Sequence, residues 1–568
     1  MKFNPYLWYP IYRTDIYVDY RKEFLLKKGN MDTKEAEVSA AGTNPAHSRN
    51  KLFSRFFPTV TSVFTGAVIF TLAVVLIALF FPSHFESATG GIKDYITQNF
   101  GWFYLLLVGA IVAFCVFIIC SPASQIRLGD PDSRPEYTKL SWLSMLFSAG
   151  MGIGLIFFGA AEPLSHFAVS SPVAPPGSKQ ALADSLKYTF FHWGIHAWAV
   201  YGIIALSLAY FKFRKKEKSL LSATLKPLFG SQTETLPGKI IDGLTIFVTA
   251  IGVAASLGFG AVQINGGLSY LFGIPNTATV QVMIILICTA CFVASALSGI
   301  GKGVKILSNL NIILAIGLMA LIIVLGPSTL FMNSFVGTIG MYLNDFLRMS
   351  FRTASLYPTR QEWIQNWTIF YWAWWISWAP FVGIFIAQIS KGRTIREFLI
   401  HVLLVPTIFS FLWFSVFGTA ATQASLSDGT IAGMATETVL FGVFNQYPYG
   451  LYLSLLAVFL IFTFFITSAD SATYVLSMLS EDGSRFPHNN VKVIWGLIIS
   501  SIAGILLVAG GLPALQNIVI ISALPFSFVI ILMIIALYKE IHHEKIEMGL
   551  YMKPKNKPEK DRPFRSYE

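Results

Sequence analysis

The chain has 568 residues, of which 54% are hydrophobic and only 12% are charged. A water-soluble protein needs about a quarter charged residues to cover its surface, so this composition excludes a purely soluble globular protein. The net charge of +11 does not indicate nucleic-acid binding. The lysines and arginines stand in short loops and tails, as expected of a membrane protein with a positive cytoplasmic side.

The first fifty residues are polar and aromatic, without a long apolar run. They do not contain the short apolar core and small-residue cleavage site of a signal peptide, so we expect the first membrane helix to be the uncleaved insertion signal. Met31 precedes a plain polar tail and is a second candidate for the start of translation. In that case residues 1–30 are an upstream artefact.

Apolar runs of about 20 residues, long enough to cross a membrane, follow one another along the rest of the chain. We expect twelve membrane helices, at 59–81, 102–120, 142–168, 187–211, 240–265, 279–299, 306–326, 363–389, 397–421, 450–479, 492–510 and 514–538. The predicted fold class is therefore an all-α integral membrane protein with twelve transmembrane helices.

The less apolar segment 330–351 carries Asp345 and Arg348 and is expected to be an amphipathic helix along the membrane interface. Basic residues gather in the loops after the even-numbered helices, whereas loops 266–278 and 422–449 contain no lysine or arginine. The positive-inside rule then places both termini in the cytoplasm of a multi-pass protein of the cell membrane, surrounded by lipid.

Two of the expected helices stand out for residues that weaken helices. The third contains Gly150, Gly152 and Gly154 within five residues, and the eighth contains Pro380 and Gly383. A broken helix survives at membrane depth only where it lines a cavity. The sequence therefore predicts that both helices are interrupted and that a cavity lies between them.

The two interruptions are five helices apart, which is typical of transporters built from inverted repeats around a binding site. We therefore expect two five-helix repeats preceded by two additional helices. The expected division is an N-terminal cytoplasmic tail (1–54), two additional helices (55–125), a first repeat (140–326), an extracytoplasmic amphipathic connector (327–362), a second repeat (363–538) and a basic cytoplasmic tail (539–568).

Aromatic residues are concentrated in segments 190–201 and 370–378. An interfacial belt would explain Trp363 and Trp367, which stand near a helix end. It explains the mid-helix tryptophans of 370–378 less well, for which core packing and a cation-binding cage both remain open. A quaternary ammonium has no N–H to donate, and aromatic faces attract it by about 0.5–2 kcal/mol per ring.

Ionisable residues inside the membrane are treated as functional candidates, here Glu162 and Asp470. His192 and His196 have the i,i+4 spacing of a metal-binding pair, although hydrogen bonding within the helix bundle is the other explanation. The sequence contains no phosphate-binding Gly-Lys-Ser/Thr loop and no enzyme constellation, so we expect neither direct use of ATP nor an enzyme.

The motifs at 148–154 (Ser-Ala-Gly-Met-Gly-Ile-Gly) and 158–163 (Phe-Gly-Ala-Ala-Glu-Pro), with the two aromatic segments, resemble the betaine/choline/carnitine transporter family over residues 55–540. The resemblance implies a ten-helix inverted-repeat core like that of the neurotransmitter:sodium symporters, two added helices and a homotrimer. It implies an aromatic box for trimethylammonium at Trp193, Trp198, Tyr201 and Trp375, with Trp378 nearby. Other implied substrate contacts are Ser256 and the backbone of Gly150, Met151, Gly152 and Gly154.

The resemblance also implies a sodium site. Its ligands would be Phe464, Thr467 and Ser468, completed by the carbonyls of Ser148 and Met151. Hydroxyl oxygens suit a hard cation, but a Thr-Ser pair in a membrane helix also serves packing. Thr249 matches a ligand of a second sodium site, at which Val253 replaces a threonine of a well-studied betaine transporter.

We expect a secondary transporter that imports glycine betaine by sodium symport through alternating access, with sodium as coupling ion and no other cofactor. The alternative is choline uptake, which could be proton-coupled. Proton-coupled choline carriers commonly place an aspartate at the position of Gly154, so this glycine favours betaine. A channel or a non-transporting receptor is a third hypothesis, which predicts no sodium-dependent accumulation.

Overall fold

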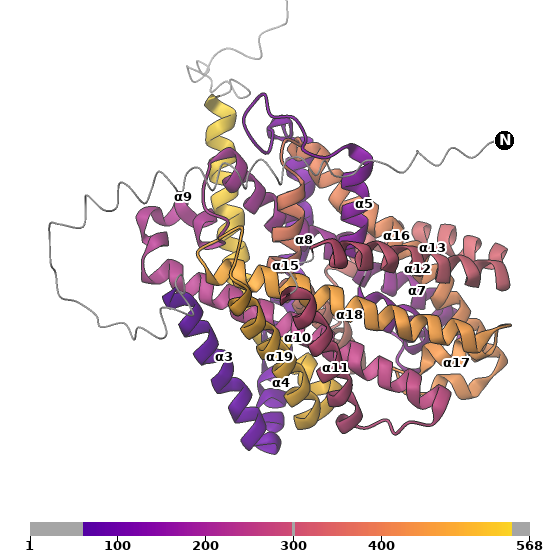
Figure 1. Cartoon of the computed structure of the whole chain (residues 1–568). Coiled ribbons are helices and arrows are strands. Elements are labelled where there is room, and N and C mark those ends of the chain that lie inside the picture. Colours follow the sequence, from indigo (N-terminus) through magenta and orange to yellow (C-terminus); the bar gives the residue numbers. More distant parts are fainter. Residues whose placement is uncertain (1–60, 151, 298–300, 548–568) are drawn as a thin grey trace, which may run out of the picture. The chain divides into compact units, whose positions relative to one another are not determined.

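The computed structural model describes residues 61–150, 152–297 and 301–547 (Figure 1). The predictions for the N-terminal tail, Met31 and Met151 fall outside these residues. Within them the chain is helical, and the only β pairing is an isolated bridge between Arg127 and Thr394. This confirms the all-α fold class.

Ten helical spans are long and apolar enough to cross a membrane. They are α3 (Ser62–Phe80), α4 (Pro82–Cys120), α7 and α8 with the following turn (Lys179–Arg214), α10 (Leu236–Phe272), α11 (Ala278–Leu297), α12 (Gly301–Leu325), α14 to α15 (Pro358–Ile389), α16 (Ile395–Ser427), α18 (Gly450–Ser480) and α19 (Asn489–Glu547). Ile153–Val169 forms a shorter apolar helix, and α19 bends at Gly510 and Gly511. The count of twelve spans stays a prediction.

The predicted interruption of the third helix is confirmed. α5 (Lys139–Gly150) and α6 (Ile153–Leu164) are separate helices, and the backbone of Gly152 is extended between them (φ −169°, ψ 179°). A turn of π-helix, Ser165–Val169, continues α6. The extended segment leaves backbone groups at the end of α5 and the start of α6 outside the regular helix ladder.

The predicted interruption of the eighth helix is wrong, because α15 (Phe370–Ile389) continues through Pro380. A single proline removes one backbone donor, and neighbouring helices compensate for that loss inside a membrane bundle. Gly383 instead serves close packing: a Cβ there would lie 2.7 Å from Ile204 Cγ2 on α8. A paired break therefore no longer supports the inverted repeats, which stay a prediction.

A break that the sequence did not predict divides α7 (Lys179–Trp193) from α8 (Ile195–Ala209) at Gly194 (φ −95°, ψ −140°). A Cβ at Gly194 would lie 2.5 Å from the carbonyl oxygen of Phe190, so only glycine fits this geometry. In one continuous helix Trp193 and Trp198 would point about 140° apart, since each residue turns the helix by about 100°. The break frees them from that constraint.

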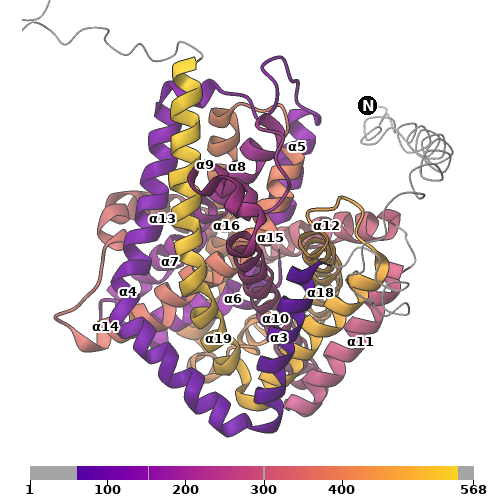
Figure 2. The same ribbon diagram turned by 90° about the vertical axis from the view of Figure 1, so that its left-hand side faces the viewer.

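The connector and the C-terminal region also contain helices. α13 (Ser328–Ser350) forms where the amphipathic helix was predicted, and Lys187 pairs with its Asp345 at 2.7 Å. Its position at the membrane interface stays a prediction. α19 packs along α4 (Figure 2), where the hydroxyl of Tyr104 donates to the carbonyl of Ile520 at 3.0 Å.

The first residues of the predicted C-terminal tail, 539–547, belong to α19. Glu544 is buried and accepts hydrogen bonds from the hydroxyl of Tyr210 (2.5 Å) and from Nε of Arg214 (2.6 Å). The beginning of the expected tail is therefore attached to the segment that follows α8.

Candidate binding site

A cavity lies where the broken span α5–α6 faces α7, α8, α10 and α15. Its lining is mostly aromatic and consists of Gly152, Ile153, Gly154, Leu155, Trp193, Ala197, Trp198, Tyr201, Ser256, Trp374, Trp375, Trp378, Val382 and Ser410. Its volume is about 60 Å³, on a measure by which one water needs about 10–15 Å³. None of these lining residues is acidic or basic.

The rings of the cavity present both faces and edges. Trp374 and Trp375 stack with their centroids 5.0 Å apart and an interplanar angle of 13°. Trp193 meets Trp375 at 4.9 Å and 70°, and Tyr201 meets it at 6.0 Å and 74°. Trp198 and Tyr201 share a face as predicted, at 5.3 Å. Rings set at right angles can enclose a compact cation from several sides.

The beginning of α6 forms the part of the wall opposite to rings of α15. A Cβ at Gly154 would lie 2.6 Å from Cη2 of Trp374 and 3.1 Å from Cη2 of Trp193, so a side chain there would enter the space between the two indoles. The first N–H groups of a helix are unpaired and carry partial positive charge. This wall is therefore suited to an anionic group. Gly150 is the last residue of α5.

Two hydrogen bonds hold tryptophans of α15 against α10. The Ser256 hydroxyl, which lines the cavity as predicted, accepts from Nε1 of Trp374 at 3.1 Å and donates to the carbonyl of Gly252 at 3.2 Å. Nε1 of Trp378 donates to the same carbonyl at 2.8 Å. The rings are thus fixed by their polar edges.

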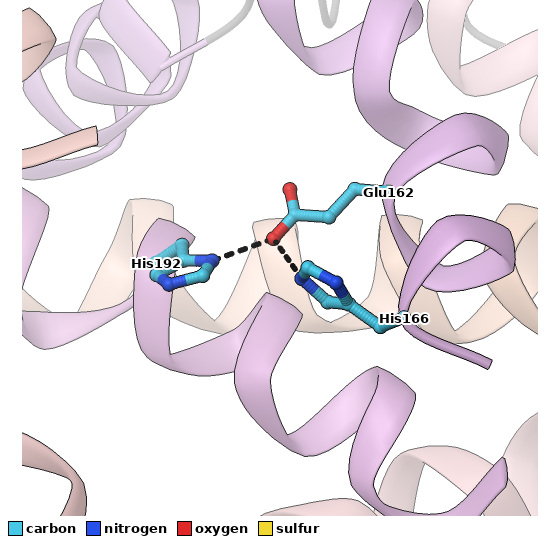
Figure 3. A group of neighbouring side chains, drawn as sticks. All are labelled: Glu162, His166 and His192. Atoms are coloured by element: carbon cyan, nitrogen blue, oxygen red, sulfur yellow. Dashed lines mark hydrogen bonds and ion pairs between the residues drawn. The ribbon is translucent and has the colours of Figure 1, made fainter. Parts of the chain in front are cut away.

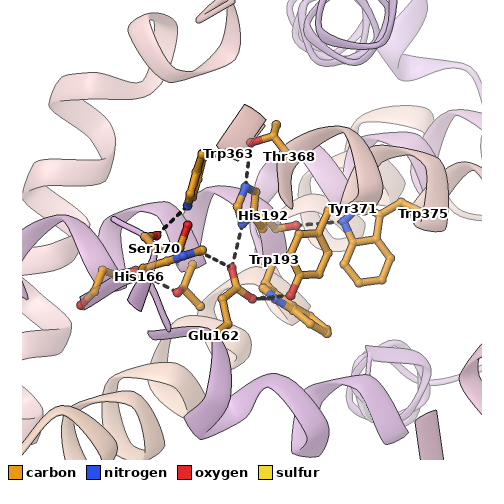
Figure 4. Close-up of polar contacts among 11 residues, drawn as sticks. Glu162, His166, Ser170, His192, Trp193, Trp363, Thr368, Tyr371 and Trp375 are labelled. Atoms are coloured by element: carbon orange, nitrogen blue, oxygen red, sulfur yellow. Dashed lines mark hydrogen bonds and ion pairs between the residues drawn. The ribbon is translucent and has the colours of Figure 1, made fainter. Parts of the chain in front are cut away.

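Behind Trp193 lies a buried cluster of polar groups around Glu162 (Figure 4). Oε2 of Glu162 accepts from Nε1 of Trp193 at 2.7 Å and from the hydroxyl of Tyr371 at 2.5 Å. Oε1 lies 2.7 Å from Nδ1 of His192 and 3.3 Å from Nε2 of His166 (Figure 3). The carboxylate therefore has two fixed donors and two imidazole contacts, which come from three helical spans.

His192 and His196 do not pair with each other, and both form hydrogen bonds within the helix bundle, which was the other explanation of their spacing. His196 bonds to the hydroxyl of Ser350 at 2.8 Å, whereas His192 bonds to Glu162 and, through Nε2, to the hydroxyl of Thr368 at 3.0 Å. Sequence reasoning identified Glu162 and missed His166, although their i,i+4 spacing on one helix was visible.

Glu162, His166 and His192 bring their ligand atoms within 4.8 Å of one another, as a metal ion would require. Their contacts already have hydrogen-bond lengths, and both oxygens of the carboxylate have hydrogen-bond partners. We therefore describe the cluster as hydrogen-bonded.

Trp363 belongs to the same region rather than to an interfacial belt, because it is buried and donates to the carbonyl of Ser170 at 2.9 Å.

The residues of the expected sodium site lie on α18 and at the end of α5. The Thr467 hydroxyl is buried and donates within its own helix to the carbonyl of Thr463 at 3.1 Å. It also accepts from Nδ2 of Asn311 at 3.1 Å, a neighbour that the sequence did not suggest. Oδ1 of Asn311 is buried, with no hydrogen-bond partner among the residues described.

The other expected sodium ligands are placed as follows. Phe464 is buried on α18, and Ser468 is half-buried one residue after Thr467. Ser148 lies within α5. Thr249 is buried on α10, where its hydroxyl donates to the carbonyl of Thr245 at 2.6 Å.

Comparison with known proteins identifies the relatives of this chain. The profile of the family described as BCCT, betaine/carnitine/choline family transporter, matches residues 62–546. A glycine betaine transporter of Bacillus subtilis strain 168, OpuD, is 53% identical over 86% of this chain and 96% of its own length. A glycine betaine transporter of Acinetobacter baylyi is 39% identical over 90% of this chain and 77% of its own.

An ectoine/hydroxyectoine transporter of Virgibacillus pantothenticus is also 39% identical, over 83% of this chain and 94% of its own length. That these relatives are transporters is consistent with the apolar spans and the aromatic cavity of the structure. The same finding argues against an enzyme and against the channel or receptor hypothesis. The chain is a multi-pass membrane protein and belongs to the betaine/carnitine/choline family of transporters.

Proposed function

We propose that this protein imports glycine betaine by sodium symport through alternating access. The observation that carries the proposal is the aromatic cavity, which is lined by five tryptophans and a tyrosine and by no acidic or basic side chain. Such a cavity favours a cation that cannot donate hydrogen bonds, because ring faces attract it without requiring a directed polar partner.

The two ends of glycine betaine match the two walls of the cavity. The trimethylammonium group would lie among Trp193, Tyr201 and Trp375, whose rings meet at steep angles. The carboxylate would face the beginning of α6 at Gly152 and Gly154, where unpaired N–H groups favour negative charge.

Choline uptake, with coupling to protons, is the alternative. Choline has no carboxylate to place at the beginning of α6, and its charge would need compensation from the protein. The lack of space for a side chain at Gly154, between Trp193 and Trp374, supports the betaine proposal. Two of the relatives are named as glycine betaine transporters.

We propose Phe464, Thr467 and Ser468, with the carbonyls of Ser148 and Met151, as the sodium site, and Thr249 as part of a second one. The unpartnered amide oxygen of Asn311 beside Thr467 supports an oxygen-rich site at this place. The five-helix repeats, the homotrimer and the cytoplasmic position of both termini belong to the same proposal.

Uptake into proteoliposomes tests the function. Labelled betaine, choline and carnitine are offered under an imposed sodium gradient or proton gradient, with ionophore-treated vesicles as the control. We expect accumulation of betaine that depends on the sodium gradient. Accumulation of choline alone, indifferent to sodium, would overturn the proposal.

A further inference from the structure

We propose that Glu162 is a specificity-determining residue, whose negative charge behind Trp193 gives the aromatic cavity its preference for a cationic headgroup. The inference rests on the proposed function and adds to it the source of the preference for positive charge. Glu162 itself does not line the cavity and would act through the indole that does.

The carboxylate of Glu162 has hydrogen-bond partners at both of its oxygens. Nε1 of Trp193 can only donate, and the hydroxyl of Tyr371 donates to the same oxygen. The other oxygen lies within hydrogen-bond distance of a ring nitrogen of His192 and of His166, each of which can carry an N–H (Figure 4). Hydrogen bonds from such donors favour the ionised form of a carboxylate, which accepts at both oxygens.

Among the residues that the structure describes, no lysine or arginine forms an ion pair with Glu162. Two other buried acids have such a partner: Glu544 pairs with Arg214 at 2.5 Å and Asp184 with Lys187 at 2.7 Å. The ion-pair partners of Glu162 are two histidines, which are cationic only when protonated. A buried negative charge without a lysine or arginine attracts any cation that enters the neighbouring cavity.

Glu162 is connected to the cavity wall through Trp193. The charge-assisted bond from Trp193 to Glu162 increases the electron density of the indole, and the ring attracts a cation through the negative charge of its face. A second connection runs through His192, whose carbonyl accepts from Nε1 of Trp375 at 2.9 Å. Trp193 and Trp375 both line the cavity, with centroids 4.9 Å apart.

A merely structural role for Glu162 would be to hold α6, α7 and α15 together. The two roles differ in their consequence for a ligand of the same shape without the positive charge. tert-Butylacetate is such a ligand, because it is glycine betaine with carbon in place of nitrogen. Loss of packing weakens both ligands alike, whereas loss of charge weakens only the binding of betaine.

The experiment measures the binding of both ligands to the purified full chain in nanodiscs by titration calorimetry, and compares wild type with Glu162→Gln. We expect the ratio of the two affinities to fall about tenfold or more, with tert-butylacetate bound as before. A parallel loss for both ligands, or an unchanged ratio, would overturn the inference. Wild-type protein that binds no betaine would refute the proposed function instead.

Tyr371→Phe makes the test independent of whether Glu162→Gln folds. It removes one donor from Oε2 of Glu162 and leaves the charge in place. We expect the affinity ratio to stay within about twofold of wild type or to rise, because less of the charge is neutralised. A tenfold fall of the ratio in Tyr371→Phe would contradict the inference, since the charge remains and only the packing contact is lost.

Discussion

Two spans of this protein are predicted to be interrupted, the one at Gly152 and the one at Pro380, but only the first of them is broken. The chain is extended at Gly152 between α5 and α6, whereas α15 passes through Pro380 without interruption. α15 is held by indole N–H groups that donate to the backbone of neighbouring helices, from Trp375 to His192 and from Trp378 to Gly252. The backbone N–H that is missing at Pro380 contributes little stability compared with these hydrogen bonds.

The difference shows that the two spans contribute different chemistry to one cavity. The broken span provides backbone groups and the space left by glycine, which suits a carboxylate. The unbroken span provides three rings at fixed angles, which suits an ammonium group. Trp374, Trp375 and Trp378 precede Pro380 in this continuous helix, and all three line the cavity.

The largest expected effect comes from filling the space at the broken span. Gly154→Leu would push a side chain between Trp374 and Trp193, where even a Cβ lies within 2.6 Å of a ring atom. We expect betaine affinity to fall about a hundredfold, equivalent to about 2.7 kcal/mol, as measured by calorimetry. Gly317→Leu on α12 is the control, because no heavy atom lies within 4 Å of its Cβ position. Equal affinities in both variants would show that Gly154 does not border the site.

A smaller effect is expected at the ion site that we propose beside the break. Thr467→Ala removes a hydroxyl ligand, so the sodium concentration for half-maximal uptake should rise about tenfold, equivalent to about 1.4 kcal/mol. Betaine affinity at saturating sodium should change little. Thr463→Ala is the matched control one turn earlier, since its hydroxyl bonds only to carbonyls of its own helix at 3.0 Å. An unchanged sodium dependence in Thr467→Ala would move the site elsewhere.

The smallest effect is expected at the unbroken span. Pro380→Ala restores a backbone N–H in a helix that is already continuous. We expect the free energy of unfolding to rise by no more than about 1 kcal/mol and sodium-driven uptake to stay within about twofold of wild type. Loss of uptake with a stable fold would show that transport requires the proline, and that the continuity of α15 belongs to one state of the cycle.

The sequence allowed the helical class, the break before α6 and the aromatic composition of the cavity to be predicted, because each leaves a local pattern. It did not allow the cluster around Glu162 to be predicted, since His192 and Tyr371 lie 30 and 209 residues away in the chain. The break at Gly194 was also hidden, because a single glycine is usually tolerated inside a helix. Its cause is a close approach to Phe190 and Phe411 that only the folded bundle reveals.

The central claim is that ring faces of this cavity hold a quaternary ammonium, and Trp375→Leu tests it most directly. Betaine binding to the purified protein is measured by calorimetry, with Trp495→Leu as the control, a buried indole that bonds to Ser480 at 2.8 Å and does not line the cavity. We predict that Trp375→Leu weakens betaine binding at least about tenfold while Trp495→Leu leaves it unchanged. Wild-type affinity in a folded Trp375→Leu protein would contradict the account.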